Sequence, residues 1–216
     1  ENILFVIVYV SGVDDRMMER IPPLVLASAS PRRRRLMSML GLPFTCVASG
    51  ADEDIPPCAP EEMVQELARV KAFAALPLVR SPSVIVGADT IVLLDGEIMG
   101  KPKDEKDARS MLGRLQGRTH AVLTGLCVLN SENGDYILDY ERTEVTFAEM
   151  TEEEISGYVS TGEPMDKAGA YGIQGLCAVY ISRITGCYYN VVGLPLHRLA
   201  KMLKKFGVCA QRKEPE

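Results

Sequence analysis

Apolar and polar positions form blocks along the chain that predict strands and helices in alternation. Short apolar runs predict strands, and longer segments with apolar positions three and four apart predict helices. In chain order, the pattern predicts strands at 24–28 and 44–49, a helix at 60–76, a strand at 84–89, a hairpin over 91–99, a helix over 104–117, strands at 119–130 and 135–149, a short helix from 151, a strand at 176–184 and a helix at 194–207. Helices between strands, with some strands joined by short turns, predict an α/β fold with a mixed sheet.

Capping and turn residues mark several ends of these elements. Ser30 is a predicted N-cap, Pro31 suits a first helical turn, and Gly41 suits the residue after that helix. The sequence "TEEE" from 151 predicts a capping box, and Asp95-Gly96 predicts the turn of the hairpin. A further helix is therefore expected directly after Ser30.

Length and composition favour one large domain. At 216 residues, we expect a single two-lobed domain over 21–207, an extension outside the core at 1–20 and a tail at 208–216. The apolar run 3–10 is far shorter than the roughly 20 residues that span a bilayer, and no basic segment precedes it as in a signal peptide. Met17 or Met18 would serve as a natural start.

The net charge of -5 and the pI near 5.3 argue against general nucleic-acid binding, which needs a broad basic surface. The six cysteines form no CxxC pair, and we interpret them as reduced thiols of an intracellular, cytoplasmic protein. The run of four arginines at 32–35 is therefore a local feature that needs its own explanation.

The arginine run begins where a strand, a serine-rich turn and a helix meet. The first turn of a helix has free N–H groups and a partial positive charge, so arginine is disfavoured there unless an anion binds. Ser28, Ser30, Arg32 and Arg33 are candidate phosphate ligands, and arginine binds phosphate in a bidentate manner. The alternative is a solvated basic face.

Lys71 lies at the centre of the apolar stripe of the helix predicted at 60–76. A lysine there either extends its ammonium to the rim of the apolar surface or meets an anion. Asp89 is predicted at the carboxyl end of strand 84–89, as a metal ligand, a general base or merely a turn residue. Glu53 belongs to an acidic loop that would suit a hard cation or face solvent, and Lys101 adds a cation after Asp89.

Nine motifs, in this order and spacing, resemble the Maf (septum formation inhibitor-like) nucleoside triphosphate pyrophosphatases. They are "LASASPRRRRLM", "DED" with Glu53, "LARVKA", "GADT", "GKP", "GRTHAVLTG", "TEVTF", "GEPMDKAGAYGIQG" and "NVVGLPL", which together cover the chain from Leu24 to about Leu203. The resemblance implies an elongated, two-lobed α/β fold with a twisted mixed sheet, flanking helices and a central cleft, related to ITP pyrophosphatases. It also implies hydrolysis of a nucleoside triphosphate to the monophosphate and pyrophosphate, a divalent metal (Mg²⁺ or Mn²⁺), and a homodimer.

The resemblance also implies a role for each matching residue. Asp89 would be the general base, and Glu53 with Asp89 would hold the metal. Arg33, Lys71 and Lys101 would hold the triphosphate. The full set of expected site residues comprises Ser28, Ser30, Arg32, Arg33, Glu53, Lys71, Asp89, Thr90, Lys101 and Gln174.

Three positions that divide the family, Arg32, Thr90 and Gln174, are similar to those of the branch that acts on dTTP and UTP. Gln174 would read the base, because its amide both donates and accepts as the edge of a uracil or thymine requires. The expected substrates are dTTP, UTP or modified pyrimidine nucleotides, as part of nucleotide-pool cleaning. Two alternatives remain open: a nucleotide-binding regulator of cell division that does not hydrolyse, and a nucleic-acid binder that uses the arginine run.

Overall fold

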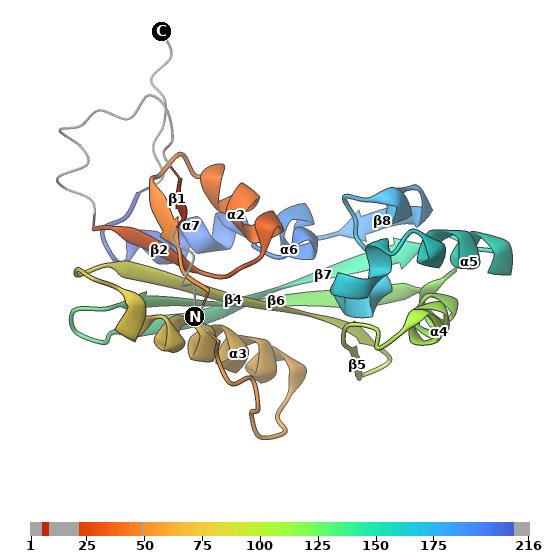
Figure 1. Ribbon diagram of the computed structural model, residues 1–216, viewed down its shortest axis with the longest axis horizontal. Coiled ribbons are helices and arrows are strands. Elements are labelled where there is room, and N and C mark those ends of the chain that lie inside the picture. Colours follow the sequence, from red (N-terminus) through yellow and green to blue (C-terminus); the bar gives the residue numbers. More distant parts are fainter. Residues whose placement is uncertain (1–5, 9–21, 49, 210–216) are drawn as a thin grey trace, which may run out of the picture. The chain divides into compact units, whose positions relative to one another are not determined.

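The computed structural model describes residues 6–8, 22–48 and 50–209 (Figure 1). These residues divide into two compact units. The first unit contains the described residues up to Asp89, then Gly125–Tyr140, and those from Gly193 onward. The second unit contains Thr90–Thr124 and Glu141–Val192.

The first unit is built on a mixed sheet. Its strands are bonded in the order β1 (Val6–Val8), β3 (Phe44–Cys46), β2 (Leu24–Ala27), β4 (Val84–Leu94), β6 (Thr119–Asn130) and β7 (Tyr136–Phe147), of which the last three continue into the second unit. Strand β2 pairs in parallel with both β3 and β4, whereas β1 pairs antiparallel with β3. The predicted α/β class with a mixed sheet is therefore confirmed.

Helices cover both faces of this sheet. Helix α3 (Pro60–Ala74) lies on one side of the strands in Figure 1, and α2 (Pro31–Ser38) and α7 (Leu196–Lys204) lie on the other. Helix α3 packs without intervening side chains at Gly87, where an added Cβ would lie 2.1 Å from the carbonyl oxygen of Ala68. Only glycine permits that approach of helix backbone to strand backbone.

The second unit has its own core. The strands β5 (Glu97–Met99) and β8 (Ile181–Thr185) pair antiparallel with β4 and β7, and the helices are α4 (Glu105–Leu115), α5 (Glu152–Ser160) and α6 (Tyr188–Val192), with short 3₁₀ helices at Glu163–Asp166, Ala168–Ala170 and Leu176–Tyr180. Buried side chains such as Leu112, Phe147 and Tyr158 fill the space beneath these helices. This core carries the segment in which Gln174 lies.

The predicted caps are confirmed. Ser30 caps α2 with Pro31 in its first turn, and Thr151 with Glu154 forms the capping box of α5. Gly41 has a φ of 70° just beyond α2, and the hairpin between β4 and β5 turns at Asp95 and Gly96, both of which have positive φ. These local signals act within a few residues, so tertiary packing leaves them unchanged.

Two predicted elements are wrong in extent. Strand β4 does not end at Asp89 but runs on to Leu94, because Ile91, Val92 and Leu94 are buried and continue the pairing toward the hairpin. The first half of the strand predicted at 176–184 is a 3₁₀ helix over Leu176–Tyr180. A third difference is small: the strand from Phe44 ends at Cys46.

Val6–Val8 pairs with β3, while most of the predicted extension 1–20 lies outside the described residues. The domain boundaries at 21 and 207, the elongated shape and the cleft stay predictions. Among the helices of the described residues, none has both the length and the apolar character needed to cross a membrane.

Candidate active site

Three predicted site residues meet in the first unit. The Lys71 ammonium donates to Oδ1 of Asp89 in an ion pair, and it lies 3.1 Å from Oε1 of Glu53. The side chains of Lys71 and Asp89 are only 16% and 13% exposed, whereas that of Glu53 is 56% exposed. Lys71 therefore meets anions, as one of the two sequence interpretations held, and it bridges a shielded carboxylate to a more accessible one.

The packing of α3 on β4 explains why Lys71 reaches Asp89. Ile85, Gly87 and Asp89 alternate along β4 and so point to one face of the sheet. Ala68 of α3 contacts that face at Gly87, and Lys71 is three residues further along the same side of the helix. The lysine consequently lies one step along the strand, at Asp89.

Arg33 of α2 is held in the same electrostatic environment. Its Nε donates to the carbonyl oxygen of Gly193 at 2.9 Å, which fixes the direction of the guanidinium. Burial lowers the pKa of Arg33, while the negative charges of Asp89 and Glu53 act in the opposite direction. Arg33 thus belongs with the lysine and the two carboxylates.

The first turn of α2 has fewer free backbone N–H groups than the sequence analysis expected. Pro31 has no N–H, Oγ of Ser30 accepts the N–H of Arg33 at 3.4 Å, and the carbonyl of Ser30 accepts that of Arg34 at 3.1 Å. Ser28 in turn accepts the N–H of Ser30 at 3.2 Å. An anion at this helix would therefore depend mainly on the arginine side chains, of which Arg32 and Arg33 are half-buried.

In the second unit, Thr90 belongs to a chain of hydroxyl contacts. Its Oγ1 lies 2.9 Å from that of Thr124, and Thr124 donates to the carbonyl oxygen of Asn190 at 3.1 Å. Because the hydroxyl proton of Thr124 is used in that bond, Thr90 donates to Thr124. The side chain of Asn190, fully buried, donates to Val122 and Thr143 and so anchors the chain in the core.

Lys101 and Gln174 also lie in the second unit, and both are exposed. Lys101 follows β5, and the carbonyl of its neighbour Gly100 accepts the N–H of Gly169 at 3.0 Å. Gln174 donates weakly to the hydroxyl of Tyr188, at 3.4 Å. The roles of Thr90, Lys101 and Gln174 in substrate binding stay predictions.

The carboxylates of the first unit fit a divalent cation. Within the described ranges, no three His, Cys, Asp or Glu side chains are grouped as metal ligands. Glu53 and Asp89 nevertheless place an oxygen each on one ammonium, so a positive charge is already held between them. Mg²⁺ is commonly bound by one or two carboxylates together with substrate phosphates, so this pair is compatible with the protein's share of such a set, and the metal site itself stays a prediction.

The mixed sheet and its covering helices agree with the protein family that the quoted motifs resemble. The same motifs contain the residues grouped in the first unit, which are Arg33, Glu53, Lys71 and Asp89. The chain belongs to the family of Maf-like proteins, whose model matches residues 23–206.

Relatives named as dTTP/UTP pyrophosphatases are similar to most of the chain. That of Symbiobacterium thermophilum is 52% identical over 186 residues, which are 85% of this chain and 94% of the relative. That of Pelotomaculum thermopropionicum is 49% identical, over 85% of this chain and 96% of the relative. The Staphylococcus aureus Ham1 protein aligns with 58% of this chain and 72% of its own, at a TM-score of 0.42 and 13% identity.

The sequence analysis assigned no partner to four residues that make long-range contacts in the fold, although a glycine near Asp89 was expected to permit close approach. Gly87 and Gly193 act through backbone position, Asn190 through a buried hydrogen bond to Val122, and Glu163 through a half-buried hydrogen bond from Tyr158 and another from the Leu176 N–H. All four lie within quoted motifs, but their partners are distant in sequence, so no local pattern identifies them.

Proposed function

We propose that the chain hydrolyses dTTP and UTP to the nucleoside monophosphate and pyrophosphate, in the manner of a nucleotide-pool-cleaning enzyme. The observation that carries the proposal is the 52% identity to a dTTP/UTP pyrophosphatase across 94% of that relative. The chemistry of the first unit supports it, because a shielded carboxylate, a second acid and two cations are the groups that attack on a polyphosphate requires.

In the proposed reaction, Asp89 takes a proton from a water molecule. The oxygen of that water forms a bond to the α-phosphorus as the bond from this phosphorus to the bridging oxygen breaks, and pyrophosphate leaves. Lys71 holds the Asp89 carboxylate in place through their ion pair and, with Arg33 and Lys101, balances charge on the triphosphate. Ser28, Ser30 and Arg32 would position the phosphates from the start of α2.

Glu53 and Asp89 are the residues that would hold Mg²⁺ or Mn²⁺, which when bound supplies charge neutralisation at the phosphate oxygens. The exposure of Glu53 leaves it accessible to a cation that arrives with the nucleotide. The ammonium of Lys71 would then turn from Glu53 toward the phosphates, since a lysine side chain adjusts readily.

Gln174 is the proposed reader of the base. Uracil and thymine present two carbonyl acceptors beside an N–H donor, and the neutral amide can complement that edge. Thr90, next to Asp89 in sequence, would hold the nucleotide in register through its fixed hydroxyl. We further propose that the protein acts in the cytoplasm, as a homodimer, without nucleic acid or membrane as partner.

A panel of standard and modified nucleoside triphosphates, with Mg²⁺ or Mn²⁺ and products resolved as mono- or diphosphate, tests the function. We expect monophosphate and pyrophosphate in equal amounts, highest kcat/KM for dTTP and UTP, and no turnover with EDTA. Diphosphate and orthophosphate as first products would refute the mechanism. Nucleotide binding without pyrophosphate release would instead favour the alternative, a regulator that does not hydrolyse.

A further inference from the structure

Gln174 lies in a tight turn of the second unit. The N–H of Gly175 donates to the carbonyl oxygen of Gly172 at 3.1 Å, so Ile173 and Gln174 occupy the two corners of the turn. The Gln174 side chain itself is exposed, and its amide makes a long contact of 3.4 Å with the Tyr188 hydroxyl. The direction of its amide therefore depends on what holds the backbone of the turn.

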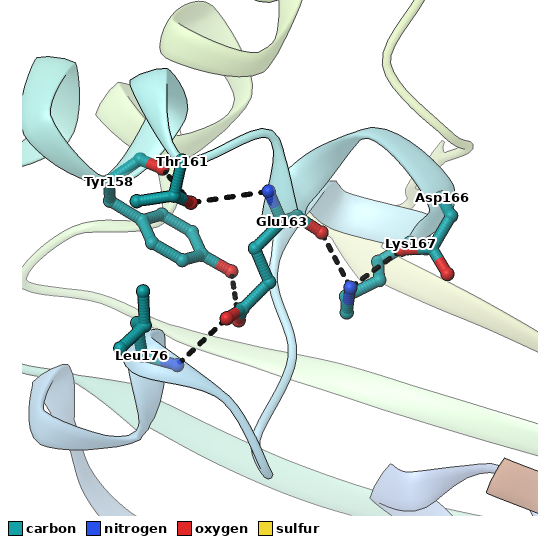
Figure 2. A network of polar contacts seen from close by, with 6 residues as sticks. All are labelled: Tyr158, Thr161, Glu163, Asp166, Lys167 and Leu176. Carbon is teal, nitrogen blue, oxygen red and sulfur yellow. Dashed lines mark hydrogen bonds and ion pairs between the residues drawn. The ribbon is translucent and has the colours of Figure 1, made fainter.

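The Glu163 carboxylate binds the end of this turn. Its Oε2 accepts the N–H of Leu176 at 3.0 Å, and its Oε1 accepts the hydroxyl of Tyr158 at 3.0 Å (Figure 2). Burial raises the pKa of the Tyr158 phenol, with the hydrogen bond to Glu163 acting in the same direction, so the phenol keeps its proton and donates. One carboxylate thus connects the core residue Tyr158 to the residue that follows the turn.

Both glycines of the turn rest against the same short segment. A Cβ at Gly175 would lie 1.9 Å from Oε1 of Glu163, and one at Gly172 would lie 2.7 Å from Cε of Lys167. Lys167 is itself fixed, because its ammonium donates to the backbone oxygen of Glu163 at 2.5 Å and to Asp166 at 2.6 Å (Figure 2). The turn is therefore seated at both ends on the segment from Glu163 to Lys167.

We propose that Glu163 is a positioning residue for substrate choice: by holding the turn Gly172–Gly175 through the Leu176 N–H, it directs the Gln174 amide toward the pyrimidine base. This proposal rests on the proposed function, in which Gln174 reads the base. It assigns Glu163 no contact with substrate. A loss of the carboxylate would free the turn and so weaken discrimination among bases rather than the hydrolytic step.

The test compares kcat/KM for UTP and for GTP in Glu163→Ala and Glu163→Gln. Glu163→Ala should lower the UTP/GTP ratio about tenfold through a higher KM for UTP, with kcat for GTP within about threefold of wild type. Glu163→Gln should keep most of the ratio, since its amide oxygen still accepts from Leu176 and its NH₂ can donate to the Tyr158 oxygen. Glu153→Ala, an exposed change on α5, is the matched control.

A double-mutant cycle with Gln174→Ala distinguishes a positioning role of Glu163 from a general loss of structure or activity. If Glu163 acts through Gln174, adding Glu163→Ala to Gln174→Ala should lower the ratio no further. Equal losses for UTP and GTP, additive losses in the cycle, or a Gln variant as impaired as the Ala variant would overturn the proposal. Should Glu163→Ala not fold, Glu163→Asp, too short to reach both Tyr158 and Leu176, takes its place in the same cycle.

The two proposals fail in different ways. A wild-type protein without preference for UTP over GTP would overturn the reading role of Gln174, and the inference on Glu163 with it. A wild-type preference that survives Glu163→Ala would overturn only the role of Glu163.

Discussion

His120 makes the stability of the second unit depend on pH. Its imidazole is 3% exposed and packs against the rings of Phe147 and Tyr171, with Nε2 2.8 Å from the Tyr171 hydroxyl. Nδ1 has no hydrogen-bond partner among the described residues, so a second N–H would have no acceptor. Burial accordingly lowers the pKa of His120 from 6.5 to about 4.

The magnitude follows from proton linkage. Below pH 6.5 the unfolded chain binds a proton at His120 that the folded chain binds only near pH 4, so stability falls as the pH falls through this window. A separation of about 2.5 units at 1.36 kcal/mol each gives about 3 kcal/mol in total, of which about 2 kcal/mol is lost between pH 7 and pH 5.

Urea unfolding of wild type and His120→Phe between pH 7 and pH 5 measures this loss. The variant keeps an aromatic ring against Phe147 but has no group that titrates at this position. Between pH 7 and pH 5, the free energy of unfolding of wild type should therefore fall by about 2 kcal/mol more than that of the variant. Tyr171→Phe keeps the buried imidazole and should retain the wild-type pH dependence. Parallel curves for wild type and His120→Phe would refute the argument that His120 is buried in its neutral form.

The remaining predictions concern the site. Asp89→Asn should lower kcat by about 10²–10⁴-fold while nucleotide binding, measured by calorimetry, persists; retention of more than about a tenth of kcat would exclude Asp89 as the base. Lys71→Met should raise KM for UTP without lowering the melting temperature appreciably, because methionine fills the apolar stripe of α3; wild-type kinetics would contradict the role of Lys71. Gln174→Glu should lower kcat/KM for UTP about tenfold relative to GTP, and an unchanged ratio would show that Gln174 does not read the base.

Much of the local structure could be predicted from the sequence. The cap at Ser30, the capping box at Thr151 and the turn at Asp95-Gly96 depend on hydrogen bonds and φ angles within four residues, which local chemistry decides. The periodicity of α3 also placed Lys71 on the side of the helix that faces the sheet. The resemblance to the family also depends on short motifs, each of which can be recognised in the sequence without knowledge of the fold.

The end of strand β4 could not be predicted in this way. Asp89 and Thr90 interrupt an apolar run, and this local pattern predicts the end of a strand. Buried apolar residues nevertheless resume on both faces of the sheet at Ile91 and Val92. Pairing with β5 and burial in the second unit outweigh the low strand propensity of one aspartate. The segment 176–180, in contrast, reads as a strand by composition, yet it follows the turn held by Glu163 and forms a 3₁₀ helix.

The sequence by itself determined which residues carry charge, where helices begin and which side of α3 is apolar. Only the tertiary structure decided that the partner of Lys71 is Asp89, eighteen residues away, with Glu53 beside it. The physical reason is the close approach of α3 to β4 at Gly87, a contact of backbone with backbone that no periodicity records. Glu163 became a functional candidate in the same way, because its two donors, Tyr158 and Leu176, come together only when the second unit is folded.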